Sequence, residues 1–139
     1  MANMAAKVVG AYFDAKGVKY EVIDEDGAVL KLGFSMDNRD GIRLIVRFDS
    51  DSEGVSVKAY DLAKFQEDKK QKMFEVCNKL NAQYRWVKFY VDESDNTITV
   101  EEDAVIQLDS CGEEVYQCCF QVVAIADEAY PEIMRAIFA

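Results

Sequence analysis

A helix followed at once by a β-hairpin, between residues 70 and 106, constrains this chain more than any other feature of its sequence. Apolar residues of the helix recur at helical spacing, which predicts one buried stripe made of Met73, Cys77, Leu80 and Tyr84. The next apolar residues alternate with polar or aromatic ones, which is the period of a strand, and they are Val87, Phe89 and Val91. An acidic turn at 92–96 and a returning strand at 97–100 complete the hairpin. Because so little chain separates them, the helix must lie across the sheet that the hairpin joins.

A first helix and four strand candidates precede this unit. Asn3 is placed to cap a helix over residues 4–16, and Gly17 is placed to end it in a left-handed turn. The strand candidates, separated by polar turns, cover residues 20–24, 28–34, 42–48 and 55–60. Consecutive strands with short connections pair antiparallel, so these segments predict one antiparallel sheet.

A third helix with a broad apolar face is predicted to start at Ser110. Tyr130 precedes Pro131, and a proline removes a helical hydrogen bond, so we expect the helix to end or kink there and a short last helix to follow. The predicted fold is α+β, an antiparallel sheet of about five to six strands with helices packed on one face. The predicted order is α-ββββ-α-ββ-α(α), in a single domain spanning residues 1–139.

The charge of the chain limits its partners. The formal net charge is −10, from 26 acidic and 16 basic residues. This charge disfavours binding to nucleic acid, which depends on neutralising phosphates, and it disfavours an anionic membrane surface. No apolar run approaches the roughly 20 residues of a membrane-spanning helix, and no signal-peptide pattern is present. We therefore expect a cytoplasmic protein that binds neither nucleic acid nor membranes.

The residues that usually carry catalysis or hold metals are scarce. There is no histidine, which removes the commonest general base and metal ligand. The acidic loop 49–54 imitates half of an EF-hand, but Tyr60 stands where that site needs a bidentate glutamate. The four cysteines lack zinc-site spacing and are expected to be reduced, buried thiols, and the acidic run 101–103 is expected to be solvated. We therefore predict no catalytic residue, no metal and no cofactor, and a binding protein rather than an enzyme.

The strand alternation also gathers an unusual set of residues on the side of the sheet away from the core. Most are basic or aromatic in an acidic protein, and they are Lys31, Arg43, Ile45, Arg47, Lys58, Tyr60, Trp86, Lys88 and Tyr90. We hypothesise a surface that docks a protein partner, with Trp86 and Tyr90 as anchors and the cations attracting an acidic or aromatic segment. The residues expected to contact the partner are Trp86, Tyr90, Tyr60, Lys88, Arg43 and Arg47. The alternative is that these cations only keep an exposed sheet face soluble and free of aggregation.

Short motifs spread over the chain resemble the YbjN family of bacterial sensory transduction regulators. They are Phe74-x-x-x-Asn78-x-x-Asn81, Trp86-x-Lys88-Phe89-x-Val91, Ile98-x-Val100 and Glu102-Asp103, and residues 8–34 are similar as well. The resemblance implies a fold similar to type III secretion chaperones, which are small, acidic and often dimeric and which bind extended segments of client proteins. It brings no catalytic residues with it.

These observations leave three functions open. The first is a non-enzymatic regulator or chaperone-like adaptor that binds a segment of a partner protein. The second is a dedicated secretion chaperone with one client protein. The third is a small-molecule sensor with a pocket between helix and sheet. A homodimer is a further prediction, with Leu80, Tyr84 and Trp86 at the contact.

Overall fold

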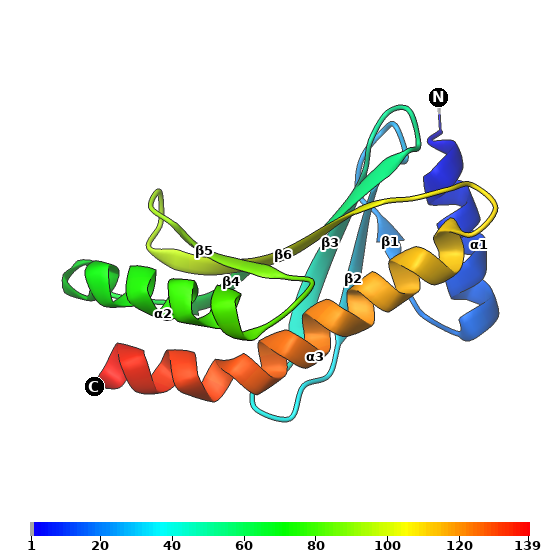
Figure 1. Cartoon of the computed structure of the whole chain (residues 1–139). Coiled ribbons are helices and arrows are strands. Elements are labelled where there is room, and N and C mark those ends of the chain that lie inside the picture. The colour runs from blue at the N-terminus through cyan, green and yellow to red at the C-terminus, as the bar shows by residue number, and fades with distance from the viewer. Residues whose placement is uncertain (1) are drawn as a thin grey trace.

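The computed structural model describes residues 2–139, which form a six-stranded antiparallel sheet with helices on one of its faces (Figure 1). The strand order across the sheet is β1-β2-β3-β4-β6-β5, and every neighbouring pair is antiparallel. The predicted α+β class and the order α-ββββ-α-ββ-α are confirmed. The elements are α1 (Met4–Lys16), β1 (Glu21–Val22), β2 (Val29–Phe34), β3 (Ile42–Phe48), β4 (Gly54–Lys64), the short 3-10 helix η1 (Glu67–Lys69), α2 (Lys70–Gln83), β5 (Lys88–Asp92), β6 (Thr97–Val105) and α3 (Cys111–Phe138).

Helix α1 begins and ends where its capping residues predict. The side chain of Asn3 accepts a hydrogen bond of 3.0 Å from the backbone N–H of Ala6, which satisfies one of the free donors of the first turn. Gly17 ends the helix with a φ of 73°, a left-handed conformation that a residue without Cβ adopts at little cost.

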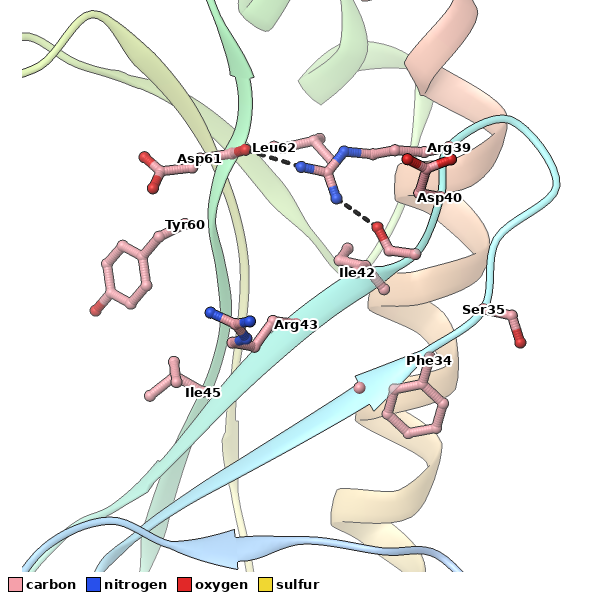
Figure 2. A pocket seen from close by; sticks show the side chains of 12 residues that line it. Phe34, Ser35, Arg39, Asp40, Ile42, Arg43, Ile45, Tyr60, Asp61 and Leu62 are labelled. Atoms are coloured by element: carbon pink, nitrogen blue, oxygen red, sulfur yellow. Dashed lines mark hydrogen bonds between the residues drawn. The ribbon is translucent and has the colours of Figure 1, made fainter.

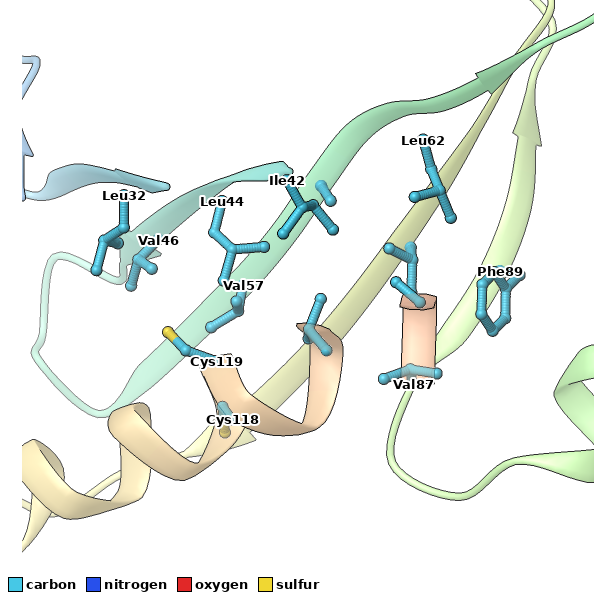
Figure 3. Packing of buried hydrophobic residues seen from close by; sticks show 14 of the residues in the cluster. Leu32, Ile42, Leu44, Val46, Val57, Leu62, Val87, Phe89, Cys118 and Cys119 are labelled. Carbon is cyan, nitrogen blue, oxygen red and sulfur yellow. The ribbon is translucent and has the colours of Figure 1, made fainter. Parts of the chain in front are cut away.

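The core lies between the sheet and the helices, and alternation along the strands decides which side chains enter it. In β3, Leu44 and Val46 are fully buried while Arg43 and Arg47 are exposed on the opposite side. Figure 3 shows the inward side chains of β2, β3 and β4 above Cys118 and Cys119 of α3, and Val87 and Phe89 further along the sheet. The alternation expected from the sequence of β3, with Arg43 and Arg47 on the side away from the core, is therefore confirmed.

Strand β4 is longer than predicted because a bulge lets it continue past Tyr60. Ala59 pairs with Val100 and Ala63 pairs with Ile98, so three residues of β4 lie opposite one residue of β6. Asp61 sits in the bulge with a left-handed φ of 57°, a conformation that aspartate tolerates better than most residues. A bulge bends its strand and re-aims nearby side chains, and here it turns the last part of the strand toward α2 and α3.

Helix α3 is continuous through Pro131, so the predicted end or break there is wrong. Pro131 has no N–H to give to the carbonyl oxygen of Asp127 one turn earlier. The side-chain amide of Asn38, in the loop between β2 and β3, donates to that oxygen at 3.0 Å. In return the carboxylate of Asp127 accepts the backbone N–H groups of Asp37 and Asn38 at 2.9 and 2.8 Å, which lower the pKa of Asp127. A side chain from the β2–β3 loop therefore replaces the hydrogen bond that the proline removes.

The continuous helix α3 spans the whole sheet (Figure 1). Its first turns pack on α1, where Gly112 lies so close to Tyr12 that an added Cβ would come within 2.7 Å of that side chain. Its last turns lie beside α2, where Lys79 and Glu132 form an ion pair of 2.8 Å. One helix therefore joins the two others across the sheet.

The edge strand β5 is capped by a side chain of α2. The N–H of Phe89 donates to Asn81 Oδ1 at 2.7 Å, and Asn81 Nδ2 donates to the carbonyl oxygen of Phe89 at 3.0 Å. These two backbone groups are the ones that a further strand would bind, because β6 pairs with the other side of β5. The amide of Asn81 therefore protects this edge in the way that edge strands generally require.

Replacing Asn38 with alanine is expected to lower the free energy of unfolding by about 1 kcal/mol, the usual net contribution of one hydrogen bond. Replacing Pro131 with alanine restores the helical N–H, so in that background Asn38→Ala is expected to have a much smaller effect. Urea unfolding of the two single variants and the double variant measures this coupling. Asp37→Ala is the matched control, because it keeps its backbone hydrogen bond. An equal effect of Asn38→Ala in both backgrounds would contradict the replacement of the lost hydrogen bond.

Candidate functional site

The side of the sheet away from the helices is the candidate site, and we call its outward side chains the open face. The strand register aligns one outward residue from each strand into a row across the whole sheet. In order from β1 to β5, this row is Glu21, Lys31, Ile45, Lys58, Glu101 and Lys88. Beside this row, Arg43 and Tyr60 line one groove, and Tyr90 of β5 pairs with Thr99 of β6.

Glu101 is the centre of the polar contacts on the β6 side of the open face. Its side chain is only 8% exposed, and the hydroxyl of Tyr90 donates to its Oε1 at 2.7 Å. The ammonium groups of Lys58 and Lys88 lie 3.7 Å from its two oxygens. The hydroxyl of Ser56 also donates to it, at 3.4 Å. A buried carboxylate is tolerated here because several donors and two cations surround it.

These contacts change what Tyr90 and Lys88 can do. Burial, followed by the hydrogen bond to Glu101, raises the pKa of Tyr90 well above its ordinary value, so its hydroxyl stays protonated and bound within the sheet face. The hydrogen bond to Asp103 and the nearby charge of Glu101 raise the pKa of Lys88. Tyr90 and Lys88 are therefore engaged with residues of their own chain before any partner arrives.

Trp86 lies in the turn before β5 rather than in the strand. Its φ is 76°, and the N–H of Val87 donates to the carbonyl oxygen of Arg85 at 2.9 Å across it, which makes a tight three-residue turn. The residue is 62% exposed, and the guanidinium carbon of Arg85 lies 5.4 Å from the centre of its ring. A large side chain in the left-handed region is rare, because its Cβ crowds the backbone.

A groove of about 830 Å³ opens on the other part of the open face, at the end of the sheet beside the β2–β3 loop. Figure 2 shows Tyr60, Arg43 and Ile45 on one side of it, with Arg39 reaching across from the loop. Arg39 donates to the backbone oxygens of Gly41 and, at 3.2 Å, Asp61, so it ties the loop to the β4 bulge. Tyr60 is 44% exposed, with the ammonium of Lys58 5.7 Å from its ring centre.

The structure separates the six predicted partner-contacting residues into groups. Arg43 and Tyr60 line the groove, and Arg47 lies further along β3. Tyr90 is next to Tyr60, which contributes to its raised pKa, while Trp86 stands apart at the far edge. The sequence reasoning missed Arg39, because only the bulge at Asp61 brings the β2–β3 loop against β4.

One of the three residues predicted to form a dimer contact is not available at the surface. Leu80 is fully buried in the core, so it has no surface to offer a second copy. The ring of Tyr84 is partly buried and packs on Phe89 with 6.5 Å between ring centres. Of the three residues named for this contact, only Trp86 is largely exposed. The dimer itself stays a prediction.

Among residues 2–139, no cluster of three or more histidine, cysteine, aspartate or glutamate side chains is arranged to hold a metal ion. The acidic loop 49–54 instead docks on the start of α1, where the N–H of Ala5 donates to Ser52 Oγ at 3.2 Å. All four cysteines are free and buried, as predicted. Burial raises the pKa of Cys77 to about 11 and that of Cys118 to about 12, so these thiols are protonated at neutral pH and are poor nucleophiles.

Two residues of the acidic run 101–103 are not solvated as expected, whereas Asp103 is exposed. Glu101 is buried on the open face, and Glu102 is 6% exposed on the opposite side, beneath α3. Burial raises the pKa of Glu102 to about 7, while a hydrogen bond with Cys118 acts in the opposite direction. The amide nitrogen of Gln121, when it faces the carboxylate, lies 3.1 Å from Oε1. These two glutamates are therefore part of the packing of the sheet rather than a solvated strand end.

The segments in the range 2–139 include no helix with the length and apolar character needed to cross a membrane. The fold, an α-ββββ-α-ββ-α chain with one open sheet face, is similar to that of the type III secretion chaperones. Two solved structures show this likeness. A chain of the heterodimeric ExoU–SpcU complex from the type III secretion system of Pseudomonas aeruginosa has a TM-score of 0.57 at 11% identity, covering 87% of this chain and 93% of that chain. A chain of the ExsC–ExsE complex has a TM-score of 0.57 at 12% identity, covering 88% and 87%.

The family follows from the sequence as well. The family model for YbjN, described as "Putative bacterial sensory transduction regulator", matches residues 5–135, and the chain belongs to this family. The crystal structure of YbjN from E. coli, described there as "a putative transcription regulator", has a TM-score of 0.65 at 15% identity, covering 91% of this chain and 92% of that chain. No curated protein matches the sequence significantly.

The buried carboxyl of Glu102 is expected to make the protein less stable as the pH rises from about 4.5 to about 7. Its pKa is raised on folding from an ordinary value of 4.5 to about 7, so the folded state holds a proton that the unfolded state has released. The contribution of the protonated Glu102 to the free energy of unfolding is complete below pH 4.5 and is lost as the pH rises through 7. The free energy of unfolding falls by at most about 1.4 kcal/mol per pH unit in this range.

Urea unfolding at a series of pH values measures this effect. Glu102→Gln is expected to remove the part of the slope that Glu102 contributes, because the amide does not ionise. Glu113→Gln, at an exposed position of α3, is the control and should keep the wild-type pH dependence. If Glu102→Gln showed the same slope as the wild type, Glu102 would not hold a proton in the folded state.

Proposed function

We propose that this chain is a non-enzymatic regulator or chaperone-like adaptor that binds a segment of a partner protein on the open face. The observation that carries the proposal is the backbone of Trp86. A left-handed conformation at a residue with a large side chain destabilises the fold by on the order of 1–3 kcal/mol, and here it holds an indole ring in solvent. Strain of this kind is typical of functional positions, and binding to a partner would offset it.

The groove beside the β4 bulge supplies a second contact region. Tyr60 is the exposed aromatic residue of this groove, with Arg43 beside it. Tryptophan, tyrosine and arginine are the residue types that most often dominate the energy of protein interfaces. Arg43 and Tyr60 on the uncovered sheet face, together with Trp86 in the turn before β5, support a protein partner over a role limited to solubility.

Two comparisons agree with a protein partner. The ExoU–SpcU and ExsC–ExsE structures are both complexes of two proteins, by their own descriptions. Their fold likeness supports a second candidate within the same class, a dedicated secretion chaperone with one client protein. The small-molecule sensor stays a third candidate, because a groove of about 700 Å³ lies between the start of α1 and strands β2 and β3.

Replacing Trp86 with glycine is expected to weaken binding at least about tenfold, which is about 1.4 kcal/mol. Glycine adopts the left-handed conformation without strain, so the free energy of unfolding should stay the same or rise. The test first identifies the partner by co-purification with the full chain from its native host, and then measures the affinity of the purified partner by calorimetry.

Two further variants complete this test. Tyr60→Ser should weaken binding independently of Trp86→Gly, because Tyr60 lies on the open face beside the β4 bulge and Trp86 lies in the turn before β5. Phe138→Ser is the control, since Phe138 is 79% exposed at the end of α3, away from the open face. Wild-type affinity in both Trp86→Gly and Tyr60→Ser would refute binding through this face.

A further inference from the structure

Ile45, at the centre of the open face, is surrounded by cations. Its neighbours across the sheet are Lys31 on β2 and Lys58 on β4, which are its register partners. Its outward neighbours along β3 are Arg43 and Arg47. Ile45 itself is half-buried, so an apolar side chain remains accessible between four basic ones. We call these five residues the Ile45 patch.

The arginines of this patch have no acidic partner in the part of the chain that is described. Every ion pair among residues 2–139 is made by a lysine. Within the patch, Lys31 pairs with Glu21 at 3.2 Å and Lys58 contacts Glu101 at 3.7 Å. In a chain of net charge −10, acidic side chains are abundant, yet none lies within ion-pair distance of Arg43 or Arg47. The two arginines are therefore free to bind an anionic group from outside.

The spacing of the patch defines the partner that fits it. Residues two apart in a strand are separated by roughly 6.5–7 Å and point to the same side, and an extended segment of another protein has the same spacing. A segment with the pattern acidic-x-apolar-x-acidic, laid along β3, would place its apolar side chain on Ile45 and its two carboxylates at Arg43 and Arg47. Arginine binds carboxylates with two parallel hydrogen bonds, which gives such a contact strength and direction.

We infer that the Ile45 patch binds an extended acidic segment of a partner protein, with one apolar residue held between two carboxylates. This inference rests on the proposed function and names the chemistry of the partner. The apolar centre and the adjacent Tyr60 favour a peptide over a polyanion, because neither residue contributes to holding phosphates. Glu21 and Glu101 border the patch and would repel a long nucleic acid or an anionic lipid surface.

The test uses fluorescence anisotropy of a labelled decapeptide that contains Glu-Ser-Leu-Ser-Glu, with the full chain at low salt. Two comparison peptides contain Glu-Ser-Ser-Ser-Glu or Lys-Ser-Leu-Ser-Lys in place of this sequence. Two further comparison probes are a single-stranded DNA and vesicles of phosphatidylserine. The Glu-Ser-Leu-Ser-Glu peptide is expected to bind most tightly, and its affinity should fall as salt screens the contacts. The double variant Arg43→Glu/Arg47→Glu is expected to weaken this binding at least about tenfold.

The control variant Lys16→Glu/Lys72→Glu changes the net charge by the same amount at exposed sites outside the open face, and it should bind the peptide as the wild type does. Equal binding by the arginine variant and the control, or equal binding of DNA or vesicles, would overturn the inference. Binding of the purified natural partner to the variants distinguishes failure of this inference from failure of the proposed function. If the partner bound Arg43→Glu/Arg47→Glu but not Trp86→Gly, only this inference would be overturned. If the partner bound all the variants equally, both would be overturned.

Discussion

The hydrogen bond that Asn38 supplies to α3 compensates for a proline within the helix that joins the other two helices across the sheet. Pro131 removes one hydrogen-bond donor from the middle of the helix, and a helix interrupted there would cover only part of the sheet. The amide of Asn38 takes the place of that donor, and the carboxylate of Asp127 holds the loop that carries Asn38. Arg39, the next residue of the loop, reaches from the ring of Tyr130 to the β4 bulge. The same loop therefore keeps α3 continuous and forms one wall of the groove on the open face.

Some basic side chains of the open face have acidic partners within the chain and others have none. The difference follows from the positions of the acidic residues on this face. Glu101 and Asp103 lie on β6, so the lysines of the neighbouring strands β4 and β5 are drawn into contacts within the chain. Strand β3 lies one strand further away, and its arginines keep their charge available. The basic residues of this face therefore differ: Lys31, Lys58 and Lys88 are paired with acidic residues of the same chain, whereas Arg43 and Arg47 are not.

Much of the fold could be predicted because its signals are local. The cap at Asn3, the turn at Gly17 and the alternation of β3 each depend on residues within a few positions of one another, and all are confirmed. The failures involve partners distant in the chain. The continuity of α3 through Pro131 depends on Asn38, about ninety residues earlier. The extension of β4 depends on a bulge at Asp61, a residue that alternation treats as the end of a strand.

The candidate site was predictable as a face but not as a set of contacts. Alternation placed Arg43, Tyr60 and Arg47 on the side away from the core, as the structure does. It could not show that Tyr90 is bound by Glu101, since that depends on the register of β5 against β6. Leu80 was assigned both to the buried stripe of α2 and to a dimer contact, and only the first is compatible with its full burial.

Asn81 gives the sheet a further property. At the outer side of β5, its amide imitates a short piece of peptide backbone and occupies the positions that the strand of another molecule would take. Fibril growth and strand exchange both begin by pairing at an unprotected margin of this kind. The Asn81 side chain therefore protects this edge from pairing with another molecule. Because α2 holds Asn81 in place, a partly unfolded molecule that lost α2 would expose the edge of β5 and become prone to aggregation.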